Sequence, residues 1–142
     1  MFCAVNEDEV VRKSDIALAC NASENHLGQV VRLLAHHGFI DAYRGRHGGM
    51  QLATPASEIN IGSVFRLFES DMPFAECFSR QNSCPLVEAC WLKDAIRNAV
   101  NAFYASLDRI TLADLVADNQ PLQALLSFQR IENCAERDPL SA

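Results

Sequence analysis

Hydrophobic residues recur at helical spacing between residues 24 and 37. They fall at positions i, i+3, i+4 and i+7, namely Leu27, Val30, Val31 and Leu34. This spacing places them on one face of a helix, with polar residues on the other faces. Ser23 stands at the expected N-cap and Gly38 at the expected end. Residues 14–20 predict a shorter helix before it, capped by Ser14, and residues 21–23 predict the turn between the two.

A hairpin is predicted directly after this helix. The segments FIDAY (39–43) and MQLA (50–53) flank RGRHGG (44–49), whose glycines favour a tight turn between two short strands. Helix, turn, helix and hairpin is the order of a winged helix-turn-helix. Residues 1–69 are therefore expected to form a DNA-binding domain of this class.

The second half of the chain predicts a long helix with an uncovered apolar stripe. Its apolar positions step by three or four and are Leu92, Ile96, Ala99, Val100, Phe103, Leu107 and Ile110. The stripe is too long for one small winged domain to cover, so a partner helix is expected. We expect a cysteine-bearing loop over residues 70–92, the long helix over 93–110, and short helices with a frayed tail over 111–142. The fold class is mainly α with a small β-hairpin wing.

The composition is that of an ordinary globular protein. Hydrophobic residues make up 49% of the chain, enough to bury a core. No apolar run approaches the roughly 20 residues that span a bilayer, and the first residues are acidic where a signal peptide needs a basic flank. We expect no membrane partner and a reducing cytoplasm, where the six cysteines are not a disulfide framework.

Charge is distributed unevenly along the chain. The net charge is −6, yet residues 12–47 carry five basic and three acidic side chains and all four histidines. Whole-chain charge averages over regions that never meet a given partner. The segment 12–47 is therefore the expected footprint of a nucleic acid, and a mildly basic one.

The second predicted helix carries candidate base-reading residues. Asn25, His26 and Gln29 lie in its first turns, where recognition residues meet base edges in the major groove, and Asn and Gln can pair bidentately with adenine. Ser23 and the helix N-terminus can hold a phosphate. On the wing, Arg44 and Arg46 stand where phosphates or a minor groove would lie. The alternative is a merely solvated helix face and an ordinary surface hairpin.

Cys77, Cys84 and Cys90 are clustered ahead of the long helix. Soft thiolates bind zinc, copper(I) or iron–sulfur clusters. The loop lacks the CxxC pair typical of a tetrahedral zinc site, and its wider gaps suit a larger inorganic core. Three incidental thiols are the alternative, with Cys90 packed under the helix. Trp91 is expected to cover the site or the core.

The other three cysteines are given no role. Cys20 is expected to be a buried small hydrophobe, and Cys3 and Cys134 lie near the ends of the chain.

Several motifs occur in the order found in one known family. They are SENHLGQVVRLLAHHGFIDAYRGRHGGMQLATPASEINIGSVFR, ECF, CPLVEAC, LK, LDRITLADLV and NQPL, within residues 10 to 128. Together they resemble the iron–sulfur winged-helix repressors that include NsrR and IscR. The closing motif and the cysteine spacing are most similar to the nitric-oxide-sensitive NsrR type.

This resemblance implies a homodimer with a long dimerisation helix and an iron–sulfur cluster on Cys77, Cys84 and Cys90, with 4Fe-4S favoured over 2Fe-2S. In that family the loaded dimer binds operator DNA, and nitric oxide attacks the cluster and releases the DNA. No catalysis is expected. The alternatives are a regulator of the same fold that senses iron–sulfur status or redox state, a small cluster carrier, and a zinc-stabilised interaction module.

The resemblance leaves the fourth cluster ligand open. Family members begin with a longer first helix, which in NsrR-like proteins lends an acidic ligand from the partner subunit, and we expect this chain to start inside that helix. Solvent, a small thiol, or an acid from Glu7, Asp8 or Glu9 are the candidates. IscR-like members use a histidine after their cysteines, but none follows His47 here.

Overall fold

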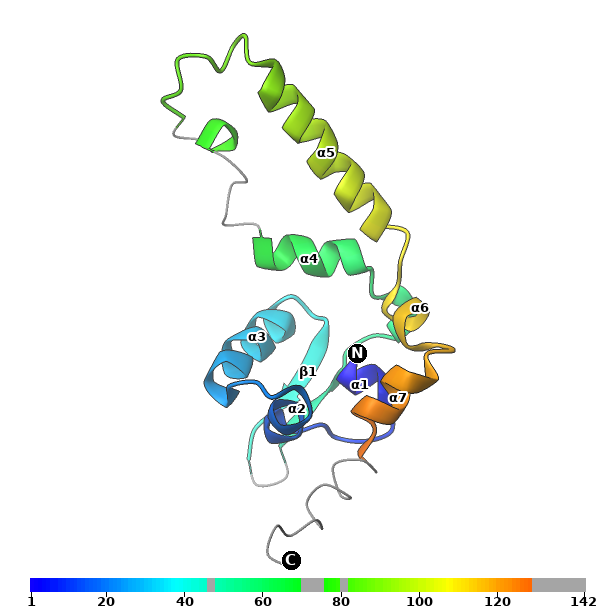
Figure 1. Ribbon diagram of the computed structural model, residues 1–142. Coiled ribbons are helices and arrows are strands. Elements are labelled where there is room, and N and C mark those ends of the chain that lie inside the picture. The colour runs from blue at the N-terminus through cyan, green and yellow to red at the C-terminus, as the bar shows by residue number, and fades with distance from the viewer. Residues whose placement is uncertain (46–47, 70–75, 80–81, 129–142) are drawn as a thin grey trace, which may run out of the picture. The chain divides into compact units, whose positions relative to one another are not determined.

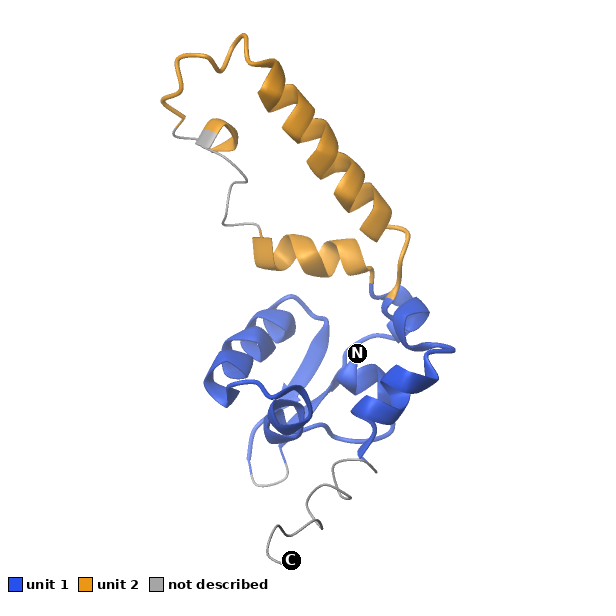
Figure 2. Ribbon diagram, viewed as in Figure 1, with its two compact units in different colours: residues 1–59, 112–142 blue, residues 60–111 orange. Residues whose placement is uncertain are grey.

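The computed structural model describes residues 1–45, 48–69, 76–79 and 82–128 (Figure 1). Its elements are α1 (Phe2–Val5), α2 (Lys13–Cys20), α3 (Glu24–His36), β1 (Ile40–Tyr43), β2 (Gly49–Leu52), η1 (Ala56–Glu58), α4 (Ile61–Glu69), η2 (Glu76–Phe78), α5 (Trp91–Leu107), α6 (Leu112–Val116) and α7 (Gln120–Leu126). The chain divides into unit 1, residues 1–59 with 112–142, and unit 2, residues 60–111 (Figure 2).

The predicted fold class is confirmed: the described chain is mainly helical with one antiparallel hairpin. None of the helices described combines the length and the apolarity that a membrane span requires. Residues 129–142 of the predicted C-terminal region, with Cys134, lie outside the described residues, as do residues 70–75 and 80–81 of the loop predicted over 70–92.

Unit 1 contains the predicted helix-turn-helix. In the turn between α2 and α3, Asn21 adopts the left-handed conformation with φ 49°, and the Ala22 N–H donates to the Ala17 carbonyl at 3.0 Å. Gly38, with φ 74°, follows the end of α3. A left-handed residue just past the last turn is a common helix ending that glycine adopts without strain.

The start of α2 differs from the prediction. Ser14 is not its cap, because the helix begins at Lys13 and Asp15 Oδ2 accepts a hydrogen bond from the Arg12 N–H at 2.8 Å. A carboxylate at this position reaches back to the N–H group that precedes the helix. The prediction favoured a serine and missed the acid that follows it.

A single β-bridge extends the hairpin beside β2. β1 and β2 pair antiparallel with Tyr43 opposite Gly49. On the other side of β2, the Val11 N–H donates to the Met50 carbonyl at 3.0 Å and the Met50 N–H donates to the Val11 carbonyl at 2.7 Å. A β-carbon at Gly49 would lie 2.6 Å from the Val11 carbonyl oxygen, so only glycine permits this close approach.

The core of unit 1 joins α1, the β-bridge and both strands. Its buried members are Phe2, Cys3, Val11, Ile40 and Met50, and the apolar face of α3 packs against them through Val31, Leu34 and Ala35. Phe2 also meets Phe128 edge-on, with ring centroids 5.6 Å apart. The helical face predicted from the sequence is thus the face that covers the core.

Two cysteines without an assigned role lie in unit 1. Cys3 is buried, and burial raises the pKa of its thiol, as expected of an unreactive core residue. Cys20 is exposed, so its expected burial is wrong. Ile16 is the residue of α2 that packs on the core, and Cys20 lies one turn beyond it at the end of the helix.

Unit 2 is built on α4 and α5. Asn60 precedes α4: its Oδ1 accepts from the Ser63 N–H at 2.9 Å, and its Nδ2 donates to the Asp108 carbonyl at 2.7 Å. Phe65 of α4 meets Phe103 of α5 edge-on, with centroids 6.1 Å apart. α4 therefore packs on the C-terminal half of α5.

The N-terminal half of α5 is left largely uncovered. Leu92 is 66% exposed, and even Phe103, in the C-terminal half that α4 contacts, is 46% exposed. Trp91 is 87% exposed, so the expectation that it covers a site or the core is wrong for the single chain. It begins α5, at the opposite end from the contacts with α4.

Candidate nucleic-acid interface and cysteine loop

One exposed face of α3 carries the three residues that the sequence predicts to read DNA bases. Asn25, His26 and Gln29 are all exposed, while Val31 and Leu34 pack toward the core. Asn25 and Gln29 are four residues apart, so they lie on adjoining turns of the same face. The three predicted base-reading residues therefore come together on the first half of one exposed helix.

Ser23 occupies the N-cap position of α3, as predicted, with φ −69° and ψ 126°. Its side chain makes no capping hydrogen bond. The first-turn N–H groups of a helix have no partner within the helix, and an anionic oxygen can satisfy them. This end of α3 is therefore suited to a phosphate group.

The wing follows β1. Arg44 is exposed, and the next residue, Gly45, has φ 109°, a conformation that favours glycine. The Gly48 N–H donates to the Gly45 carbonyl at 2.9 Å and closes the turn. Arg46, the second predicted wing residue, lies outside the described residues.

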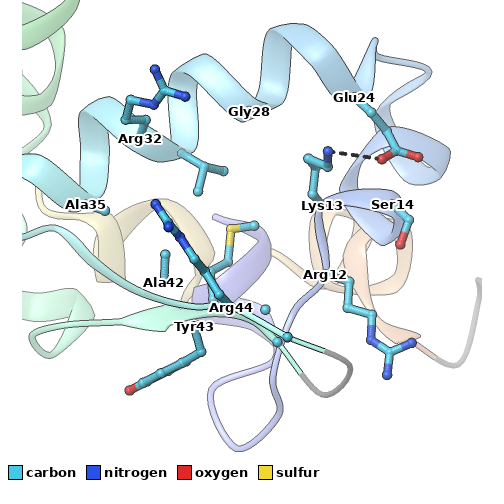
Figure 3. A pocket seen from close by; sticks show the side chains of 15 residues that line it. Arg12, Lys13, Ser14, Glu24, Gly28, Arg32, Ala35, Ala42, Tyr43 and Arg44 are labelled. Carbon is cyan, nitrogen blue, oxygen red and sulfur yellow. Dashed lines mark ion pairs between the residues drawn. The ribbon is translucent and has the colours of Figure 1, made fainter.

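A groove of about 610 Å³ lies between α3 and the hairpin (Figure 3). Four basic side chains line it: Arg12, Lys13, Arg32 and Arg44. Glu24 is the acidic residue among its described lining residues, and its Oε2 lies 3.4 Å from Lys13 Nζ. The sequence showed that these residues belong to the basic segment. It could not show that α2, α3 and the wing bring them to one groove.

The three predicted ligand cysteines all lie in unit 2. Cys77 is in η2, Cys84 precedes a run of turns, and Cys90 is the N-cap of α5. Each is half-buried and free of disulfide bonds. Within the described ranges, no three side chains of His, Cys, Asp or Glu are placed so that they could hold a metal ion. The structure thus puts the thiols on one segment without gathering them around a single ion.

The sulfur of Cys90 has a helix-terminal environment. Its Sγ accepts a hydrogen bond from the Lys93 N–H at 3.4 Å. The Cys84 N–H donates to Asn82 Oδ1 at 2.9 Å, which orders the chain around the second thiol. Cysteine thiolates are soft ligands, the kind that bind iron–sulfur clusters. The donor chemistry therefore fits an iron–sulfur cluster.

Comparison with known proteins gives consistent matches. Residues 1–118 match the Rrf2 family, described as iron-dependent transcriptional regulators. The HTH-type transcriptional regulator NsrR of Geobacillus kaustophilus is 41% identical over 128 residues, which cover 89% of this chain and 87% of the relative. The regulator of the same name from Oceanobacillus iheyensis is 37% identical over 127 residues, covering 89% and 86%.

The fold has a solved counterpart. The structure of T. potens IscR matches with a TM-score of 0.65 and 25% identity, covering 86% of this chain and 81% of that one. Sequence and fold are thus both shared with regulators of transcription.

Proposed function

The chain belongs to the Rrf2 family of transcriptional regulators, and we propose that it is a DNA-binding repressor whose operator binding is controlled by an iron–sulfur cluster that senses nitric oxide. Its relatives are regulators and not enzymes. The observation that carries the proposal is the exposed row of Asn25, His26 and Gln29 on α3, beside a basic groove and wing.

Base reading is assigned to α3. Asn25 and Gln29 carry amides that can pair with adenine, and His26 lies beside them on the same exposed half of the helix. We assign Ser23 and Arg44 to phosphates of the DNA backbone. Arg46 is assigned, from the sequence, to the backbone or the minor groove.

The functional unit is proposed to be a homodimer. Support comes from the exposed apolar surface of α5, which includes Trp91, Leu92 and Phe103. Large contiguous apolar surfaces on soluble proteins mark interaction sites. A two-fold dimer presents two copies of α3 to half-sites one helical turn apart. A repressor acts on DNA, so we place it in the cytoplasm.

Cys77, Cys84 and Cys90 would hold the cluster, 4Fe-4S in preference to 2Fe-2S. When bound, the cluster supplies an iron that nitric oxide can reach. Support comes from three free thiols on one segment, from the N–H donor at Cys90 Sγ, and from the iron dependence in the family description. No residue is assigned as fourth ligand.

A second candidate is a regulator of the same fold that responds to iron–sulfur status or redox state. The thiols are free, and within the described residues they form no ready metal site. Such thiols could respond to oxidants directly. The fold match to T. potens IscR is compatible with either signal. A cluster carrier or a zinc-stabilised module would require no operator.

Selection of randomised duplexes by the anaerobically isolated protein tests the DNA-binding proposal. We expect enrichment of a sequence with two-fold symmetry, bound at least about 10³-fold more tightly than random DNA. If successive rounds enrich no sequence, the chain is not an operator-specific repressor. Iron and sulfide analysis of the same preparation separates a cluster protein from a zinc protein.

A further inference from the structure

Positive charge is concentrated in the groove between α3 and the hairpin. Four basic side chains and one acidic side chain line it, a balance of +3, in a chain whose net charge is −6. Clefts lined by one sign of charge focus the electrostatic field and attract the opposite charge. An anion is therefore the expected occupant.

The basic side chains that line the groove come from separate elements. Lys13 begins α2, Arg32 lies on α3, and Arg44 follows β1. Figure 3 shows Arg44 reaching from the hairpin toward α3, whereas Arg12 points away from the other three. Among the ion pairs in the part of the chain that the structure describes, none involves Arg32 or Arg44. Both guanidinium groups are thus available to an external anion.

Several residues that line the groove have no side chain. Four glycines line it: Gly28 on α3 and Gly45, Gly48 and Gly49 on the hairpin. Gly28 precedes Arg32 by one helical turn, and a β-carbon there would meet nothing within 4 Å. Packing therefore does not require glycine at 28, and its effect is to leave open space on α3 one turn before Arg32. Missing side chains allow a ligand backbone to approach closely.

Glu24 opposes anion binding at one end of the groove. It pairs with Lys13, and the two side chains are 52% and 45% exposed. Exposed pairs of this kind are weak, so a phosphate can compete for Lys13. The carboxylate itself still repels the phosphate.

From this arrangement we infer that the groove binds the phosphate backbone of duplex DNA through Lys13, Arg32 and Arg44. The inference rests on the proposed DNA-binding function. Lys13 and Arg32, which lie outside the base-reading row, are then phosphate contacts. Glu24 lowers the affinity of the groove for DNA.

The test is a salt titration of the full chain against a random-sequence duplex and a selected operator. Each lost phosphate contact reduces the slope of log K against log salt by about 0.9 on B-DNA. Lys13→Gln, Arg32→Gln and Arg44→Gln should each show this loss on both duplexes, and Arg32→Lys should keep most of the slope. Glu24→Gln should bind random DNA more tightly than wild type. Arg109→Gln, in unit 2, is the charge-matched control and should leave the slope unchanged.

The outcomes separate the inference from the proposed function. If wild type binds the operator selectively while all three glutamine variants keep its slope, the groove does not hold the backbone and the function stands. If wild type binds neither duplex, the DNA-binding function is wrong and the inference falls with it. A circular dichroism melt of each variant shows that it is folded.

Discussion

Arg66 and Asp108, 42 residues apart in the sequence, face each other through two parallel hydrogen bonds, Nη1 to Oδ1 at 2.6 Å and Nη2 to Oδ2 at 2.7 Å. The Arg66 guanidinium also lies 4.4 Å from the centre of the Tyr104 ring, and Tyr104 Oη donates to Glu69 Oε2 at 2.6 Å. Together these contacts join α4 to the C-terminal end of α5. Cys90 lies at the opposite end of α5, as its N-cap.

This pair should make the stability of unit 2 depend on pH. The hydrogen bonds from Arg66 hold the pKa of Asp108 below its ordinary value. The pair's contribution is therefore present above the ordinary carboxyl pKa and is lost as the pH falls through the lowered value. Asp108→Asn should lower Tm modestly at neutral pH, because both side chains are partly exposed, and the difference from wild type should shrink in acid. Asp94→Asn, in the more exposed pair with Arg97, is the control. A Tm difference that stays constant into acid would contradict the assignment.

Glycine at position 49 should be required for stability. An alanine β-carbon would meet the Val11 carbonyl oxygen at 2.6 Å, and overpacking of this kind costs about 1–3 kcal/mol. Gly28→Ala is the matched control, because it has nothing within 4 Å and lies inside α3. There alanine should stabilise by about 0.5–1 kcal/mol. Urea unfolding measures both, and equal effects of the two substitutions would count against the close approach at Gly49.

The exposed stripe of α5 should hold the dimer together. Burying a phenylalanine side chain contributes about 1.5–3 kcal/mol, so Phe103→Glu should yield monomers by light scattering. Because Phe103 also contacts Phe65, Leu92→Glu gives a second variant at a position 66% exposed. Asn101→Glu, on the other side of α5, should leave the dimer intact. A monomeric wild type with its cluster present would overturn the assembly proposed.

Gln29 should contribute to sequence recognition and Arg44 to general affinity. Gln29→Ala should lose about 1–3 kcal/mol on a matched operator and little on random DNA, as expected when a bidentate base contact is removed. Arg44→Ala should weaken binding to both. Fluorescence anisotropy against the two duplexes measures the difference. Equal losses on both duplexes for both variants would mean that α3 does not read sequence.

Local pattern was sufficient to predict the DNA-binding elements. The spacing of Val31 and Leu34 fixed the inward face of α3, and the glycines between two short apolar runs fixed the hairpin. Both signals arise within a few residues, where backbone geometry and burial act together. The exposure of Asn25, His26 and Gln29 follows directly, since residues that are not on the core face of a helix are exposed.

The features that the sequence did not predict depend on contacts between elements that are distant in the sequence. Cys20 and Trp91 are apolar enough to be buried, but each stands at a helix end that none of the described residues of its unit covers. The basic groove depends on three elements meeting, and no spacing in the sequence encodes that meeting. The short β-bridge of Val11 to Met50 was missed for the same reason.

Control of operator binding by a cluster on Cys77, Cys84 and Cys90 is tested most directly by titrating the operator with anaerobically isolated protein before and after nitric oxide. Cys84→Ser should lose the visible absorption and the tight binding, because a missing anchor exposes the cluster to loss. Cys20→Ser, at an exposed thiol outside the loop, should behave as wild type. The account predicts tight operator binding by the loaded wild type and its loss on addition of nitric oxide. Operator binding that is unchanged by nitric oxide, or retained in full by Cys84→Ser, would contradict it.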